Sequence, residues 1–133
     1  MKYTSLGSSG LQVSEVCLGT MTWGIQNTQQ DTDDQMAVAL SSGINFLDTA
    51  EMYPIPPNEP TSGDTERQLG DWLSRNQTQR DELIVMTKIA GSGIHWIRDG
   101  DIINAENIAT AIEGSLQCLQ TSYIDVYQLH WPN

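Results

Sequence analysis

Four short apolar segments recur along the chain and alternate with longer segments of mixed polarity. They cover residues 15–18, 44–47, 83–86 and 123–130. Short runs of this composition predict buried β-strands. Between them, apolar residues return every three to four positions, which predicts amphipathic helices. Strands that alternate with helices run parallel, so the pattern predicts an α/β fold with a parallel sheet.

Three helices are predicted between these strands. The first has Asp31 or Thr32 as its N-terminal cap and Gly43 just past its end. The second spans about residues 64–74, and the third follows a cap at Asn104. The positions predicted to face the core are Met36, Ala39 and Leu40 in the first helix, Leu69, Trp72 and Leu73 in the second, and Ile108, Ala111, Ile112, Ser115, Leu116 and Leu119 in the third.

Two shorter alternating segments precede the first predicted strand. They cover residues 3–6 and 11–14 and flank the tetrad Gly7-Ser8-Ser9-Gly10. Because clusters of glycine and serine favour tight turns, a β-hairpin is predicted at the N-terminus.

Ionisable side chains stand at the ends of three predicted strands. Asp48 follows the second strand, Lys88 follows the third, and His130 ends the fourth, at intervals of 40 and 42 residues. Right-handed crossovers place the C-terminal ends of parallel strands at one edge, which is where (β/α)8 barrels carry their active sites. We expect these side chains and Tyr53 to converge there. Any one of them alone has a commoner structural explanation, such as a turn cap for Asp48, but the four together favour an active site.

Four segments of the chain resemble the N-terminal half of an aldo-keto reductase. They read GLQVSEVCLGTMTWG, INFLDTAEMYP, IVMTKIAG and SLQCLQTSYIDVYQLHWP, in that order. The long connection AEMYPIPPNEPTSGDTE most resembles the Tas-like branch of the bacterial members. The resemblance covers essentially the whole chain.

The resemblance implies a (β/α)8 TIM barrel. Residues 1–133 would form the N-terminal half of this single barrel domain, with the first four strands and three helices preceded by the hairpin, which would close the bottom of the barrel. Such a barrel needs roughly 250 residues, and the chain has 133. We therefore expect a truncated or partial chain.

The resemblance also implies a reaction, the NADPH-dependent reduction of aldehydes or ketones to alcohols. Tyr53 would donate the proton, and Lys88 and Asp48 would help its phenol to release that proton. His130 would orient the carbonyl. These roles suit the chemistry, because hydride transfer to a carbonyl leaves an alkoxide that must be protonated as it forms. An ammonium group beside a phenol stabilises the phenolate that remains.

The cofactor and substrate contacts follow from the same resemblance. The nicotinamide would lie against Gly19, Thr20, Met21 and Asp48, whereas NADPH rather than NADH is an expectation from the family alone. The substrate would be a small carbonyl compound in an apolar pocket. The tryptophans expected to line this pocket are Trp23, Trp96 and Trp131, although Trp23 in its glycine-bounded loop also fits an interior residue.

The composition narrows the classes of partner. Six Lys and Arg stand against 17 Asp and Glu, a formal net charge of −11. This excess of acid argues against nucleic acid or an anionic membrane as a partner. It also leaves few cations for the phosphates of a dinucleotide.

Other signals are expected to be absent. Cys17 and Cys118 lie in apolar contexts and are predicted to be small buried residues, with neither a disulfide nor a metal site. No G-x-G-x-x-G follows the first strand. The N-terminus does not resemble a signal peptide, and no apolar run approaches 18 residues, so a cytoplasmic location is expected.

Two alternatives to an active reductase remain open. One is a redox-sensing or regulatory subunit that binds cofactor without significant turnover. The other is a non-catalytic, isolated half-barrel. In a half-barrel the first and fourth strands would have bare edges, and self-association through these edges is expected.

Overall fold

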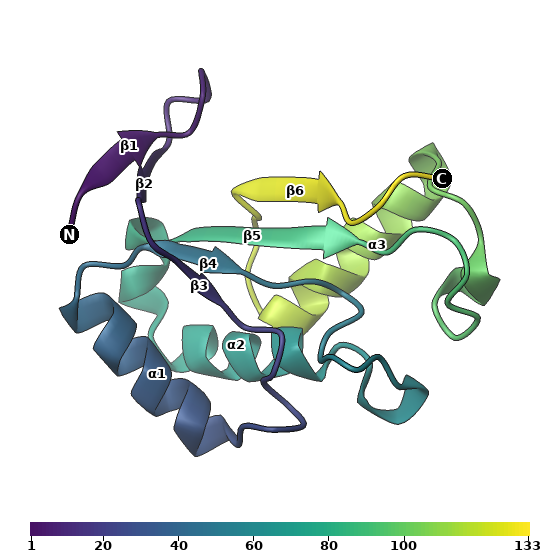
Figure 1. Cartoon of the computed structure of the whole chain (residues 1–133), viewed down its shortest axis with the longest axis horizontal. Coiled ribbons are helices and arrows are strands. Elements are labelled where there is room, and N and C mark those ends of the chain that lie inside the picture. The colour runs from purple at the N-terminus through teal and green to yellow at the C-terminus, as the bar shows by residue number, and fades with distance from the viewer.

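A parallel sheet of four strands forms the centre of the computed structural model, which describes residues 1–133 (Figure 1). The strands lie in the order β3 (Cys17–Gly19), β4 (Phe46–Asp48), β5 (Ile84–Ile89) and β6 (Val126–Leu129). Each strand pairs in parallel with the next. The predicted α/β fold with a parallel sheet is confirmed.

The predicted hairpin is also present and is separate from this sheet. Its strands are β1 (Tyr3–Ser5) and β2 (Gln12–Ser14), which pair antiparallel. Asn45, just before β4, accepts a hydrogen bond from Ser14 N at 2.7 Å and donates one to the Gln12 carbonyl at 3.0 Å. These bonds fix the hairpin at the end of the sheet where the parallel strands begin.

Three helices lie on one side of the sheet (Figure 1). They are α1 (Gln29–Ser41), α2 (Asp64–Arg75) and α3 (Ala105–Leu119), and Asn104 caps α3 as predicted. Three short 3₁₀ turns, η1 (Glu59–Thr61), η2 (Gln77–Glu82) and η3 (Arg98–Gly100), occur in the connections.

The predicted cap of α1 is wrong. The N-cap is Thr28, whose hydroxyl accepts a hydrogen bond from Asp31 N, while the Asp31 carboxylate accepts one from Thr28 N at 2.8 Å. This reciprocal pair is a capping box, in which the acidic residue stands three positions after the cap. The helix therefore begins three residues earlier than an Asp31 cap requires.

The core lies between the sheet and the helices. Nine buried residues form it, namely Trp23, Met36, Leu47, Leu69, Trp72, Leu73, Leu83, Val85 and Leu119. The predicted faces of α1 and α2 are buried except Leu40, which is half-buried. In α3, Ile108, Ile112 and Leu116 are only partly buried. Ile112 and Leu116 lie beside β6, an edge strand that no further element covers.

The two cysteines are free, and Cys17 is exposed rather than buried as predicted. Leu18, the next residue of β3, packs against the core, so Cys17 faces the opposite side of the sheet, which no helix covers. Cys118, in α3, is half-buried. The prediction failed because an apolar sequence context does not show which face of the sheet the helices cover.

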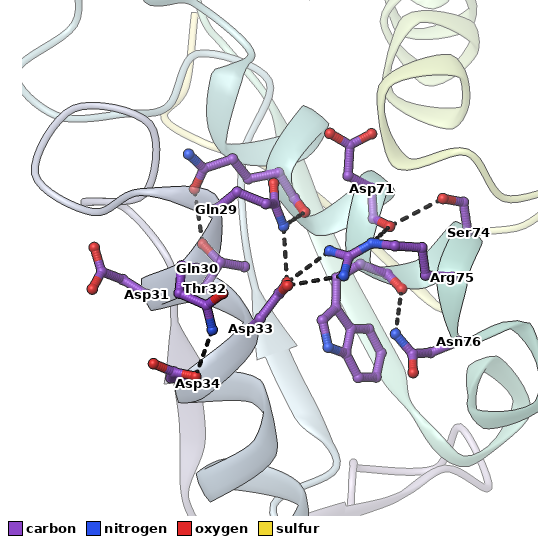
Figure 2. Close-up of polar contacts among 12 residues, drawn as sticks. Gln29, Gln30, Asp31, Thr32, Asp33, Asp34, Asp71, Ser74, Arg75 and Asn76 are labelled. Carbon is purple, nitrogen blue, oxygen red and sulfur yellow. Dashed lines mark hydrogen bonds and ion pairs between the residues drawn. The ribbon is translucent and has the colours of Figure 1, made fainter.

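Polar contacts fix the helices to one another and to the sheet. Figure 2 shows Arg75 of α2 donating to both carboxylate oxygens of Asp33 in α1, at 2.8 and 2.9 Å. At the base of β6, Arg80 and Asp125 form a buried ion pair of 2.8 Å. Asp125 also accepts a hydrogen bond from Val85 N at 2.9 Å.

None of the helices combines the length and the apolar character that a membrane-crossing segment requires.

The contact between α2 and α3 depends on one glycine, and this gives the first prediction. A Cβ at Gly70 would lie 2.0 Å from the Cys118 carbonyl oxygen, whereas a Cβ at Gly114 of α3 would meet nothing within 4 Å. Gly70→Ala should therefore lower the free energy of unfolding by about 1–3 kcal/mol. Gly114→Ala should raise it by about 1 kcal/mol through helix propensity. Urea denaturation measures both, and equal midpoints for the two variants would contradict the predicted helix contact.

Candidate active site

Asp48, Lys88 and His130 meet at the C-terminal edge of the sheet. Asp48 ends β4, Lys88 lies near the end of β5, and His130 follows β6 directly. Lys88 is inside its strand rather than after it, because β5 continues to Ile89. The Asp48 Oδ1 and Lys88 Nζ atoms are 2.6 Å apart. The convergence predicted from the spacing is therefore present.

Three oxygen atoms surround the Lys88 ammonium group. Besides Asp48, Nζ donates to the Thr49 carbonyl at 2.7 Å and lies 3.5 Å from Tyr53 Oη, at the long limit for a hydrogen bond. Lys88 is only 8% exposed. An ammonium group has three donors and is costly to bury without partners. These partners compensate the positive charge and hold the ammonium group beside the Tyr53 phenol.

Tyr53 is held in place by backbone bonds on both sides. Its N–H donates to the Ala50 carbonyl at 3.1 Å, and its own carbonyl accepts from Gly63 N at 2.9 Å, just before α2. The adjacent proline-rich loop is bound to the loop after β3, since Ile55 N donates to the Met21 carbonyl at 2.8 Å. The phenol therefore has a fixed position beside Lys88.

His130 completes the group. Its ring meets the Tyr53 ring edge-on, with centroids 5.5 Å apart and an interplanar angle of 78°. Burial lowers the pKa of His130, and the nearby Lys88 ammonium lowers it further. His130 is therefore neutral at neutral pH, so one of its ring nitrogens carries a proton and can donate it in a hydrogen bond.

Besides Asp48, three residues are expected at the nicotinamide, and they differ in exposure. Gly19 is exposed, with nothing within 4 Å of the position a Cβ would take, and Met21 is 51% exposed. Thr20 is fully buried, and its hydroxyl donates to the Asp48 carbonyl at 2.8 Å. Gly19 and Met21 therefore offer surface beside Asp48, whereas the Thr20 side chain links β3 to β4.

The three tryptophans do not form one pocket. Trp23 is fully buried in the core and its indole N–H donates to Gln35 Oε1 at 2.7 Å, so its predicted place in a substrate pocket is wrong and the interior alternative is correct. Trp131 packs beside Tyr53 and His130. Trp96 is 39% exposed on the loop after β5.

Sequence reasoning missed the apolar residues that surround Tyr53. A second cluster consists of Ala50, Met52, Tyr53 and Ala90, with Ile55, Ile94, Ile97 and Trp131 packed against it. Ile94 and Ile97 belong to a glycine-rich loop with no periodic pattern, so no sequence signal marked them. Tyr53 therefore belongs to an apolar cluster that includes aliphatic side chains and the Trp131 indole.

A buried carboxyl group, also missed, lies directly behind the site. Glu66 of α2 is 1% exposed and accepts a hydrogen bond from Thr87 Oγ1 at 2.6 Å. Thr87 precedes Lys88 in β5, and successive residues of a strand face opposite sides of the sheet. Burial raises the pKa of Glu66 to about 7, and the Thr87 bond opposes this shift only in part.

Comparison with known proteins identifies the class to which this fold and site belong. The model of the aldo/keto reductase family matches residues 15–133. The chain belongs to the aldo/keto reductase family.

Individual relatives agree with this assignment. Protein tas of Escherichia coli is 42% identical over 135 residues, which cover 99% of this chain and 39% of that protein. The uncharacterized oxidoreductase YrpG of Bacillus subtilis is 35% identical over 136 residues, covering 98% of this chain and 40% of that protein. The chain thus spans about two-fifths of the length of these relatives.

Solved structures give the same fold. A putative aldo-keto reductase from Pseudomonas aeruginosa matches with a TM-score of 0.75 and 28% identity, over 97% of this chain and 46% of that one. A thermostable aldo-keto reductase matches with a TM-score of 0.73 and 26% identity, over 100% of this chain and 44% of that one. The sheet of four strands therefore corresponds to part of a TIM barrel, as predicted.

The electrostatic environment of His130 can be tested directly. The pKa of His130 should lie below its ordinary value of 6.5, and Lys88→Met should raise it, because a nearby positive charge is lost and the Asp48 charge that raises it is freed. NMR titration of the imidazole protons measures both values. Lys2→Met removes the same charge near the hairpin and should leave the pKa of His130 unchanged. An unchanged pKa in Lys88→Met would show that the two groups are not neighbours.

Glu66 should make stability depend on pH. Its folded-state pKa of about 7 lies above its ordinary value of 4.5. Its contribution to stability is therefore fully present below pH 4.5 and is lost as pH rises through 7. Glu66→Gln removes this titration, so the variant should gain on the order of 3 kcal/mol relative to the parent between pH 4.5 and 8. Urea denaturation across this range measures the difference. If the free energies of unfolding of the two proteins change in parallel with pH, Glu66 does not have the raised pKa.

Proposed function

We propose that this chain carries the catalytic side chains of an oxidoreductase that uses NADPH to reduce aldehydes or ketones to alcohols. The observation that carries the proposal is the contact series from Asp48 through Lys88 to Tyr53, with His130 against the Tyr53 ring. Charged and titratable groups placed together at the C-terminal edge of a TIM-barrel sheet are typical of catalysis.

Each side chain has one task in the proposed reaction. The nicotinamide, when bound, supplies the hydride. Tyr53 Oη gives its proton to the carbonyl oxygen as that oxygen gains negative charge. The Lys88 ammonium stabilises the remaining phenolate, and Asp48 holds Lys88 in position. The neutral His130 donates a hydrogen bond to the same carbonyl oxygen and orients it.

The residues fit the two ends of the cofactor unequally. Gly19 and Met21 leave accessible surface beside Asp48, which suits a flat nicotinamide ring. Cations for the phosphates are scarce, because five of the six Lys and Arg residues already pair with carboxylates. The sixth, Lys2, is next to the hairpin at the opposite end of the sheet. We infer that this chain holds the nicotinamide end and contributes little to binding the phosphates.

The proton donor is tested by removing the phenolic hydroxyl. Tyr53→Phe should reduce turnover of an aldehyde with NADPH by about two to four orders of magnitude. Tyr123→Phe is the matched control, because Tyr123 donates to Asp81 at the base of the sheet and should leave turnover unchanged. The assay follows NADPH absorbance, in this chain and in one extended to the length of its relatives.

Turnover that survives in Tyr53→Phe would rule out this donor. Tight NADPH binding without turnover in either chain would favour the regulatory alternative.

A further inference from the structure

An ion pair anchors the long loop between β5 and α3 (Figure 1). Arg98 Nη1 donates to Glu51 Oε2 at 2.7 Å, and Arg98 Nη2 donates to Glu51 Oε1 at 2.6 Å. Both side chains are largely buried, at 15% and 12% exposure. A bidentate pair of this kind is directional and holds its partners in one geometry.

The same pair joins three segments near the candidate site. Glu51 lies between Asp48 and Tyr53 in the turn after β4, and its N–H donates to the Lys88 carbonyl at 3.3 Å. Its carboxylate accepts a hydrogen bond from Ala90 N, at the start of the loop. Arg98 Nη2 also donates to the Ala90 carbonyl, at 3.3 Å. The turn that carries Tyr53, the end of β5 and the middle of the loop therefore share one network.

The loop backbone is unfavourable where Arg98 stands. Arg98 and Asp99 have φ angles of 46° and 55°, in the left-handed region that residues with a Cβ seldom occupy. Burial of an ion pair also removes two charges from water, so the pair is weak evidence for stability alone. Residues in such conformations persist only where the surrounding structure fixes them, and they cluster at functional sites.

That placement brings two aliphatic residues to the apolar cluster that contains Tyr53. Ile94 and Ile97 of the loop pack against the cluster of Ala50, Met52, Tyr53 and Ala90. Between them, the Trp96 side chain remains partly exposed. Ile94 and Ile97 therefore form the loop side of this apolar cluster.

We propose that Glu51 and Arg98 are a positioning pair that holds residues 91–104 so that Ile94 and Ile97 form an apolar wall beside Tyr53. The wall favours carbonyl compounds that carry an apolar group, such as an aromatic ring, over small hydrophilic ones. The substrate preference rests on the proposed function, whereas the placement of the loop does not.

Hydrogen exchange tests the placement of the loop. In Arg98→Met, the loop amides that are hydrogen-bonded in the structure should exchange at least about tenfold faster, while those of β5 and α2 keep their rates. The reporters are Gly93, Ile97 and Gly100, whose N–H groups donate to carbonyls within the loop at 2.9 to 3.0 Å.

Arg98→Lys keeps the charge and should restore part of the protection. Arg75→Met, which breaks the bidentate pair between α1 and α2, is the matched control and should leave the loop unchanged. Unchanged loop exchange in Arg98→Met would overturn the positioning pair.

Binding of a carbonyl probe tests the wall without requiring turnover. Benzaldehyde added to the chain should shift the NMR signals of the Ile94 and Ile97 methyl groups saturably, while those of Ile112 on α3 stay unchanged. In Arg98→Met the dissociation constant for benzaldehyde should rise severalfold, and that for acetaldehyde should change little. Equal weakening for both probes, or no shift at Ile94 and Ile97, would refute the wall. If the chain binds benzaldehyde in this way but a chain extended to the length of its relatives reduces no aldehyde, the proposed function is refuted and the wall stands.

Discussion

The burial of one ammonium group constrains the whole functional end of the molecule. Lys88 is almost inaccessible, and its charge is tolerated only because a carboxylate and a carbonyl oxygen lie within 2.7 Å of it. Those oxygens come from Asp48 and Thr49, at the end of the neighbouring strand. The register of β4 and β5, the turn that follows β4 and the position of Tyr53 must all agree before this charge can be accommodated. The arrangement of the site is therefore a condition of folding as well as of the proposed chemistry.

The sequence predicted the features that depend on periodicity. Strands at regular intervals, amphipathic helices and the crossover rule were enough to bring Asp48, Lys88 and His130 to one edge of the sheet. The helix caps and the covered face of the sheet were harder to predict, because both depend on neighbouring segments. Asp31 is the N3 residue of a capping box instead of the cap, and Cys17 is exposed because it lies on the face of the sheet that no helix covers.

The surroundings of the site were the least predictable part. A tryptophan in a glycine-bounded loop, such as Trp23, is a plausible pocket residue. The loop nevertheless turns its indole into the core against α1. Glu51 and Arg98 are 47 positions apart, and no periodic pattern connects an acidic residue in one loop with a basic residue in another. Glu66 is polar in a helix whose neighbouring positions face the core, so its burial follows from packing against β5 and from the Thr87 hydroxyl. Such contacts between distant segments are decided by the tertiary fold.

Two of the three largely buried ion pairs lie at opposite ends of the sheet. Arg80 and Asp125 lie where β5 and β6 begin, and Lys88 and Asp48 lie where β5 and β4 end. Several strand residues separate the two pairs along β5, so each can vary without disturbing the other. Substitutions can therefore strengthen the base of the sheet without altering the proposed active site, and the proposed active site can change while the base preserves the fold.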